Sequence, residues 1–347
     1  MKVFITGGAG FVGVNVADYH LRLGDDVVVF DNLSRDGTAW NVDWLRERHR
    51  DRVSLVHGDI RDFGTLRDAI PRGADRVYHM AAQVAVTTSV RDPREDFEIN
   101  ALGTFNVLEA VRLAAPEAVV LYASTNKVYG GMESVAVVEE ETRYRYRELS
   151  EGVPEGQPLD FHSPYGCSKG SGDQYVRDYA RIYGLRTVVM RQSCIYGIRQ
   201  MGAEDQGWMA YFCIAVRLGW PITIYGNGKQ VRDVLWIEDL IAAYDAAADR
   251  IDVSTGEIFN IGGGPTNTVS VWREFGPMLE RRAGSELTVT YADWRPGDQP
   301  VYVSDIRKAE RVLGWRPNVS VGEGVDRLWQ WVDANPTLFA PSPSLKS

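Results

Sequence analysis

The chain has 347 residues, of which 44% are hydrophobic and 24% charged, and its formal net charge is −9 at pH 7. This length and composition indicate a soluble globular protein with one large domain or two closely joined ones. The acidic balance argues against a protein that binds nucleic acid non-specifically, although it leaves room for a basic pocket.

Short apolar or β-branched runs alternate with helix-length segments through the first half of the chain. The predicted strands are 2–6, 26–31, 53–59, 76–82, 119–124 and 186–192. Strands separated by helical segments predict right-handed βαβ units and a parallel sheet. Between the fourth and fifth strands, the spacing of apolar residues predicts one helix over 96–115.

From about residue 195 this alternation fades, and glycine, tryptophan and proline become frequent. We therefore predict an α/β fold, in which a Rossmann-type doubly wound parallel sheet is followed by a smaller C-terminal α/β domain. The first domain is expected over 1–190, with 231–263 returning to it, and the second domain over 191–347.

The first predicted strand runs directly into a glycine-rich loop, TGGAGFVG. Its glycines fit the spacing G-x-x-G-x-x-G at Gly7, Gly10 and Gly13. Such glycines allow a tight turn and let backbone N–H groups approach a pyrophosphate at the N-terminus of the next helix. A glycine triplet alone is a weak signal, but here a strand precedes it and a helical pattern follows it. We therefore expect a loop that binds a dinucleotide.

An acidic residue, Asp31, ends the second predicted strand, eighteen residues beyond Gly13. A carboxylate at about this spacing accepts a hydrogen bond from a ribose hydroxyl of a bound dinucleotide. It would also repel a 2′-phosphate, so we expect NAD rather than NADP. The nearby Arg35 leaves the phosphorylated cofactor open at this stage.

Two further predicted strands end in residues that suit a cofactor. Asp59 and Ile60 end the third strand, where a carboxylate could meet an adenine amino group or cap the next helix. Ala81 and Gln83 end the fourth, where small residues would let a cofactor lie against the backbone. Ligands of open α/β sheets collect at these carboxyl ends, so both places are candidate contacts.

The fifth predicted strand ends in the hydroxyls of Ser124 and Thr125, and a later segment carries Tyr165 and Lys169. Four residues apart on a helix, the phenol and the ammonium share one face. Opposite charges about 4 Å apart interact by ~4 kcal/mol at an effective dielectric near 20, enough to lower a tyrosine pKa by up to ~3 units. These groups would make a proton-transfer site for hydride chemistry. Taken alone, the pair could also be an exposed tyrosine beside an unrelated lysine.

Other features of the sequence narrow its setting. The chain opens on MKVFITGG, without the apolar core of a signal peptide, and no run approaches the ~18 apolar residues of a membrane span. We expect a cytoplasmic protein that contacts no membrane. The cysteines Cys167, Cys194 and Cys213 show no C-x-x-C or Cys/His spacing, so we expect neither a disulfide framework nor a metal site.

Long stretches of the chain resemble the extended short-chain dehydrogenase/reductase family, which contains nucleotide-sugar epimerases and dehydratases. They include TGGAGFVG at 6–13, DNLSR at 31–35, DFEINALGT at 96–104, STNKVYG at 124–130, DFHSPYGCSKG at 160–170 and DIRKAERVLGWRP at 305–317. Within the family they are most similar to the epimerases that invert C2 of CDP-hexoses such as CDP-paratose.

The resemblance implies an enzyme that holds NAD tightly and inverts C2 of a nucleotide-sugar, most readily a CDP-sugar, through a transient 2-keto sugar. Tyr165 would remove the proton of the sugar hydroxyl while hydride passes to the nicotinamide. Substrates of the CDP-paratose type are expected, with CDP-glucose left open. The first domain would bind NAD and the second the substrate. Members of the family commonly pair, so we expect a homodimer or homotetramer.

The motifs and the resemblance together give the expected site residues. The catalytic set is Ser124, Thr125, Tyr165 and Lys169. The residues expected at the cofactor are Gly7, Gly10, Phe11, Val12, Gly13, Asp31, Asn32, Ser34, Arg35, Asp59, Ile60, Ala81, Gln83, Asn100, Tyr165 and Lys169. Those expected at the substrate are Gln83, Thr88, Thr125, Asn126, Gln206, Tyr225, Arg232, Arg295 and Asp298. By the resemblance, Arg232 and Arg295 would grip the diphosphate, because guanidinium forks suit phosphates.

Several alternatives stay open. Dehydratases of the family carry acidic residues directly after the catalytic Ser/Thr, whereas this chain has Asn126 and Lys127 there, so elimination lacks its carboxylate. A 4-epimerase of the UDP-galactose type could use the same Tyr165 and Lys169. A non-catalytic scaffold that senses NAD would be expected to have lost that pair. The aromatic-rich segment 133–161 would be either an active-site flap or a solvated loop.

Overall fold

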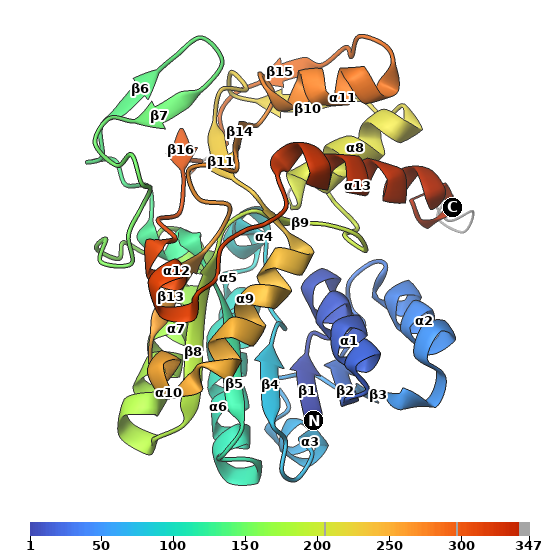
Figure 1. Cartoon of the computed structure of the whole chain (residues 1–347), viewed down its shortest axis with the longest axis vertical. Coiled ribbons are helices and arrows are strands. Elements are labelled where there is room, and N and C mark those ends of the chain that lie inside the picture. Colours follow the sequence, from blue (N-terminus) through green and yellow to red (C-terminus); the bar gives the residue numbers. More distant parts are fainter. Residues whose placement is uncertain (205, 296–297, 340–347) are drawn as a thin grey trace.

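A seven-stranded parallel sheet forms the centre of the computed structural model, which describes residues 1–204, 206–295 and 298–339 (Figure 1). Its strand order is β13-β8-β5-β4-β1-β2-β3, and every neighbouring pair is parallel. The strands are β1 (Lys2–Thr6), β2 (Asp26–Asp31), β3 (Val53–His57), β4 (Arg76–His79), β5 (Val119–Thr125), β8 (Arg186–Gln192) and β13 (Ile258–Ile261). The chain winds outward from β1 in both directions, which confirms the predicted Rossmann-type doubly wound sheet.

All of the strands predicted from the sequence are present, but two of them end earlier than predicted. β3 ends at His57 and β4 ends at His79. Beyond β4 the chain packs against the glycine loop, because a Cβ on Gly7 would lie 2.5 Å from the backbone nitrogen of Ala81. The ladder pairing of β4 ends at His79, and the N–H of Met80 still donates to the carbonyl of Thr6 at 3.0 Å.

Helices cover both faces of the sheet, and the alternation of side chains along β1 shows why. Val3 and Ile5 pack into the core on one face, whereas Phe4 packs into the core on the other. The first core includes side chains of α1 (Phe11–Leu23), α2 (Thr38–His49) and α9 (Ile237–Asp249). The second includes side chains of α3 (Phe63–Ala69), α6 (Gly103–Ala114) and α7 (Ser163–Tyr183).

The single helix predicted over 96–115 is wrong in one respect, because the chain forms three segments there. They are α5 (Pro93–Phe97), the wide π turn η2 (Glu98–Leu102) and α6. Asn100 lies in the π turn and donates its side-chain amide to the carbonyl of Gln83 at 2.9 Å. Wide turns of this kind inside helices frequently mark functional sites.

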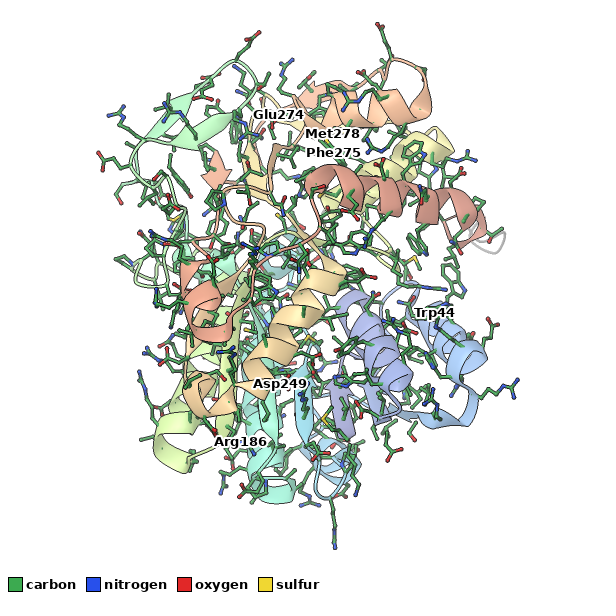
Figure 2. The ribbon with its side chains drawn as sticks, in the orientation of Figure 1. Trp44, Arg186, Asp249, Glu274, Phe275 and Met278 are labelled. Carbon is green, nitrogen blue, oxygen red and sulfur yellow. The ribbon has the colours of Figure 1, made fainter. Side chains whose placement is uncertain are left out.

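Smaller elements lie above the carboxyl ends of the central strands in Figure 1. The short strands there pair as β10 (Thr223–Tyr225) with β15 (Thr290–Ala292), β9 (Ile195–Tyr196) with β12 (Leu235–Trp236), and β14 (Thr268–Ser270), β11 (Val231–Asp233) and β16 (Val301–Tyr302). The helices beside them are α8 (Trp208–Leu218), α11 (Phe275–Ala283) and α13 (Val321–Ala334). Phe275 of α11, which Figure 2 labels, packs edge-on against Trp208 with ring centroids 5.2 Å apart. The division of the chain at residue 190 stays a prediction, while α9 and β13, from the segment 231–263, belong to the central sheet layers.

The remaining elements connect these layers. They are η1 (Arg50–Arg52), α4 (Val86–Arg91), η3 (Asn126–Tyr129), α10 (Ile251–Ser254), α12 (Arg307–Leu313) and η4 (Pro336–Leu338), and the antiparallel hairpin of β6 (Val137–Glu139) and β7 (Tyr144–Tyr146). The hairpin belongs to the segment 133–161 and is anchored, because Tyr146 is buried and Arg143 pairs with Glu274. Glu274, labelled in Figure 2, is the residue before α11. Within the described residues, no helix is long and apolar enough to cross a lipid bilayer.

We expect Gly13→Ala to lower the free energy of unfolding by about 2 kcal/mol, because overpacking of a tight site typically costs 1–3 kcal/mol. The new Cβ would lie 2.2 Å from the carbonyl oxygen of Gly7. Gly322→Ala in α13 is the control, since its Cβ would meet nothing within 4 Å and alanine favours a helix by up to about 1 kcal/mol. Urea unfolding followed by circular dichroism measures both, and equal effects would contradict the close packing of the loop.

Candidate active site

The glycine loop joins β1 to the N-terminus of α1 and leaves no room for a side chain at Gly7 or Gly13. Gly7 has φ 66° and donates its N–H to the carbonyl of Phe30 at 2.8 Å. Gly10 caps α1, and a Cβ there would meet only the carbonyl oxygen of Gly7 at 3.2 Å. Phe11 and Val12 follow at the start of the helix and line a large cavity. Backbone N–H groups at a helix N-terminus beside an open cavity fit a pyrophosphate.

The carboxylate of Asp31 braces this loop from the end of β2. It accepts the N–H of Ala9 at 3.0 Å and the N–H of Leu33 at 2.8 Å, and burial raises its pKa. Next to it, the amide of Asn32 donates to Asp59 at 2.9 Å. Hydrogen bonds from Arg61 hold the pKa of Asp59 at about 2. The acidic residues predicted for a bound dinucleotide therefore lie together at one edge of the sheet.

The other residues predicted for this edge divide into exposed and buried groups. Ser34 and Arg35 are exposed, and Arg35 forms a hydrogen bond with Gln206 from the upper elements. Ile60 is buried and packs closely against Gly103. A Cβ on Gly103 would lie only 2.4 Å from the Cδ1 atom of Ile60.

Gln83 and Asn100 lie beside each other and depend on a buried carboxylate that the sequence analysis did not single out. Asp96 is fully buried and accepts from Gln83 at 2.8 Å, from Asn100 at 3.0 Å and from Ser168 of α7 at 2.5 Å. These hydrogen bonds tie the loop after β4 to α5, η2 and α7. Thr88 lies in α4 and does not line the cavity, in contrast to its neighbour Thr87.

A cavity of about 840 Å³ lies between the carboxyl ends of the sheet and the upper elements. This is within the range of small-molecule and cofactor sites. Of the predicted residues, those that line it are Phe11, Val12, Ser124, Thr125, Asn126, Tyr165, Lys169, Gln206, Tyr225, Arg232, Arg295 and Asp298. The structure thus brings the predicted catalytic residues and most of the predicted substrate residues to one space.

Tyr165 and Lys169 lie near the start of α7, on one face as predicted, and both side chains are buried. The ammonium of Lys169 donates to the carbonyl of Ala123 at 2.7 Å and lies 4.3 Å from the ring centroid of Tyr122. Burial lowers the pKa of Lys169 to about 7. Burial raises the pKa of Tyr165 to about 12, and a hydrogen bond with Thr125 opposes that rise. The expected lowering of the tyrosine pKa by the lysine is therefore not found, because the ammonium is held at β5 and desolvation of the phenol dominates.

The two hydroxyls that end β5 have different environments. Ser124 donates to Asp173 at 2.7 Å, and Asp173 also accepts two hydrogen bonds from Arg191, each 2.9 Å long. The hydroxyl of Thr125 remains at the cavity, close to Asn126 and the phenol of Tyr165. Thr125 is therefore the better placed of the two predicted catalytic hydroxyls, whereas that of Ser124 is engaged by a buried carboxylate.

The cavity lining as a whole has an excess of positive charge. Arg232 pairs with Asp298, and Arg295 lies 4.0 Å from the ring centroid of Tyr225 and donates to the carbonyl of Glu204 at 3.1 Å. Among the described residues that line the whole cavity, the cations are Lys127, Lys169, Arg232 and Arg295 and the anions are Glu204 and Asp298. This excess of positive charge suits an anionic ligand such as a diphosphate.

Three residues of this site went unrecognised in the sequence. Arg191 is a charged residue within a strand of apolar residues, which could have signalled a buried partner. Asp173 and Asp96 lie on helices, where a carboxylate without a tertiary context reads as a solvated residue. Their partners are up to 72 residues away in the sequence, so no local pattern connects them.

Comparison with known proteins covers nearly the whole chain. A family model described as GDP-mannose 4,6 dehydratase matches residues 4–328. The chain is 45% identical to CDP-paratose 2-epimerase from Salmonella typhi over 340 residues, which cover 96% of this chain and 100% of that protein. It is 31% identical to a putative UDP-glucose 4-epimerase from Methanocaldococcus jannaschii, with 96% and 99% of the two chains covered.

Solved structures of similar fold cover nearly the whole chain. A dTDP-glucose 4,6-dehydratase from Streptomyces venezuelae, with NAD and TYD bound, has a TM-score of 0.83 and 30% identity, covering 98% of this chain and 99% of that one. A UDP-glucose 4-epimerase from Thermotoga maritima, with UDP-glucose, has a TM-score of 0.82 and 29% identity, covering 97% and 100%.

The lowered pKa of Lys169 predicts a pH-dependent effect of Lys169→Met in protein stripped of bound nucleotide. Between the folded pKa of about 7 and the unfolded value of 10.5, the unfolded lysine holds more protons than the folded one. The free energy of unfolding of the wild type should therefore rise across this window relative to that of the variant, by about 1 kcal/mol per pH unit.

Urea unfolding at pH 7.5 and 9.5 measures this difference. Lys229→Met is the matched control, because that ammonium pairs with Glu139 away from the cavity. Parallel pH profiles for Lys169→Met and the wild type would contradict the near-neutral pKa.

Proposed function

Because the chain belongs to the family of NAD-dependent nucleotide-sugar epimerases and dehydratases, we propose that it inverts C2 of a CDP-hexose. Its near full-length similarity to epimerases supports a nucleotide-sugar epimerase. The observation that supports inversion at C2 of a CDP-hexose is the 45% identity to a CDP-paratose 2-epimerase over 96% of the chain. CDP-paratose, which would give CDP-tyvelose, is the proposed substrate type, with CDP-glucose as a second candidate.

NAD is the cofactor, and the residues present fit it. The glycine loop offers N–H groups beside the cavity, and Asp31 offers a carboxylate at the end of β2 for the adenosine ribose. Phe11 and Val12 line the same cavity as Tyr165. When bound, NAD⁺ would accept the hydride and, once reduced, would return it. Its positive charge would offset part of the rise in the pKa of Tyr165 that burial causes.

The chain's own residues then move one proton and hold the sugar. Thr125 donates a hydrogen bond to the sugar oxygen, and Tyr165 takes the hydroxyl proton as the carbon is oxidised to a ketone. Tyr165 returns the proton when the ketone is reduced, and the ammonium of Lys169 stays on the carbonyl of Ala123 at the wall of the same cavity. Inversion requires the ketone to present its other face, so the nucleotide must stay anchored while the sugar turns. Arg232 and Arg295 are the anchors that we propose for its diphosphate.

Alternative activities are weaker on the residues of this chain. A 4-epimerase would use the same Thr125, Tyr165 and Lys169, and relatives of that activity are about 30% identical. Dehydration would need a carboxylate directly after Thr125, where Asn126 and Lys127 stand. A non-catalytic scaffold would have no need for a buried, intact pair of Tyr165 and Lys169.

We also propose that the protein forms a homodimer or homotetramer. Large apolar side chains are exposed on neighbouring helices of the sheet's second face, namely Phe97, Phe105, Tyr175, Ile182 and Tyr183. Such a group of exposed apolar residues is typical of an interaction surface. Sedimentation of the purified protein measures the oligomeric state.

Tyr165→Phe should lower turnover by at least ~10²-fold, in the range for loss of a general acid–base group. The substitution removes the proposed proton acceptor and keeps the ring, so the thermal unfolding temperature and the NAD content should stay close to those of the wild type. Steady-state kinetics with a sugar nucleotide measures the effect. Near-normal turnover would remove Tyr165 from the mechanism.

Hydride transfer predicts that the hydrogen on C2 never meets solvent. Epimerisation in D₂O should therefore give a product without carbon-bound deuterium, and substrate deuterated at C2 should keep its label at C2. NMR of the product, with a panel of CDP-, UDP- and GDP-sugars, reads both the label and the position inverted. Deuterium gained from solvent would refute the hydride route, and oxidation traced to C4 would support the 4-epimerase.

A further inference from the structure

The backbone of Lys127 lies between two of the proposed reactive residues, Thr125 and Tyr165. It lies in η3, the turn directly after Thr125, and donates its backbone N–H to the hydroxyl of Thr125 at 3.2 Å. Its carbonyl oxygen lies 3.4 Å from where a Cβ on Gly166, the neighbour of Tyr165, would be. The backbone of Lys127 is therefore fixed between the two residues that act on the sugar.

The side chain of Lys127 extends into the cavity without a protein partner. It lines the cavity, and its ammonium forms no hydrogen bond or ion pair with any residue in the described part of the chain. Burial lowers the pKa of Lys127, the charge of Arg232 lowers it further and the charge of Asp298 opposes this. The ammonium thus lies close enough to Arg232 and Asp298 to share their electrostatic environment.

This local cluster has an excess of positive charge. Arg232 already pairs with Asp298 through its guanidinium, which leaves the charge of Lys127 without a counter-charge in the cluster. An unpaired cation in a partly buried cavity is costly, and an anion placed between Lys127 and Arg232 would relieve it. Hydrogen bonds from cations to phosphate oxygens are among the stronger ones in proteins.

We propose that Lys127 and Arg232 together bind the phosphate attached to the sugar of the nucleotide-sugar, and that Lys127 thereby selects the carbon that reacts. This inference rests on the proposed function and deepens it. The phosphate is attached through oxygen to C1, C2 is the next carbon of the ring, and C4 lies across the ring. A phosphate bound by Lys127 would lie within the length of a lysine side chain from Thr125 and Tyr165. C2, the carbon beside C1, would then be the sugar carbon nearest to these two residues.

The test compares nucleoside monophosphates with diphosphates, because these ligands differ by the phosphate in question. Calorimetric titration of the purified holoenzyme with CMP and CDP, and in parallel with UMP and UDP, gives the ratio of the two affinities. Lys127→Met should reduce the preference for the diphosphate by about 10-fold or more, in the range for hydrogen bonds to charged groups, while monophosphate affinity stays within about 2-fold. Lys127→Arg should restore much of the preference because it keeps a cation.

Lys229→Met removes a lysine outside the cavity by the same substitution, so it should leave the preference unchanged. Thermal unfolding shows that each variant is folded. An equal loss for mono- and diphosphates in Lys127→Met, or no loss for either, would overturn the proposal. Inversion at C4 by the wild type, read by NMR, would overturn the proposed function and the selection of C2, whereas the phosphate contact is decided by the affinity ratios alone.

Discussion

The buried ion pair between Asp173 of α7 and Arg191 of β8 holds the reactive helix on the sheet. Its two hydrogen bonds are each 2.9 Å long, and the side chains are 0% and 2% exposed. Removing such charges from water is expensive, and the two-pronged contact offsets that cost only while both partners stay in place. Because Asp173 also accepts the hydroxyl of Ser124, the same pair connects α7 to the end of β5. Tyr165 and Lys169 therefore lie on a helix, α7, that cannot shift on the sheet without leaving a buried charge unpaired.

The same network continues to the elements above the sheet. Arg191 donates to the hydroxyl of Tyr129 at 3.0 Å, and this hydroxyl donates to Asn260 of β13 at 2.7 Å. Asn260 in turn donates to the carbonyl of Val153 at 2.8 Å. Side chains from β8, η3 and β13 are thus joined to the segment that follows the hairpin of β6 and β7. Buried hydrogen bonds therefore connect the catalytic wall of the cavity to three other parts of the fold.

The net charge of the cavity lining is opposite in sign to the net charge of the whole chain. The formal net charge is −9, yet the described cavity lining has four cations and two anions. A low-dielectric cavity strengthens such charges, so an anionic dinucleotide and a diphosphate substrate are both favoured there. Burial also lowers the pKa of Lys169 to about 7, so its charge is sensitive to what occupies the cavity. The fold therefore places attraction for a diphosphate and proton transfer within one cavity.

The sequence by itself determined the features that depend on neighbouring residues. Strand periodicity located β1, β2 and β8, the glycine spacing located the loop before α1, and four-residue spacing put Tyr165 and Lys169 on one helical face. The tertiary structure decided the choice between Ser124 and Thr125, because Asp173 lies 49 residues from Ser124. It also decided that Lys169 bonds to β5 and that Lys127 lies near Arg232. These arrangements join residues far apart in the chain, and their burial sets pKa values that no local pattern of side chains contains.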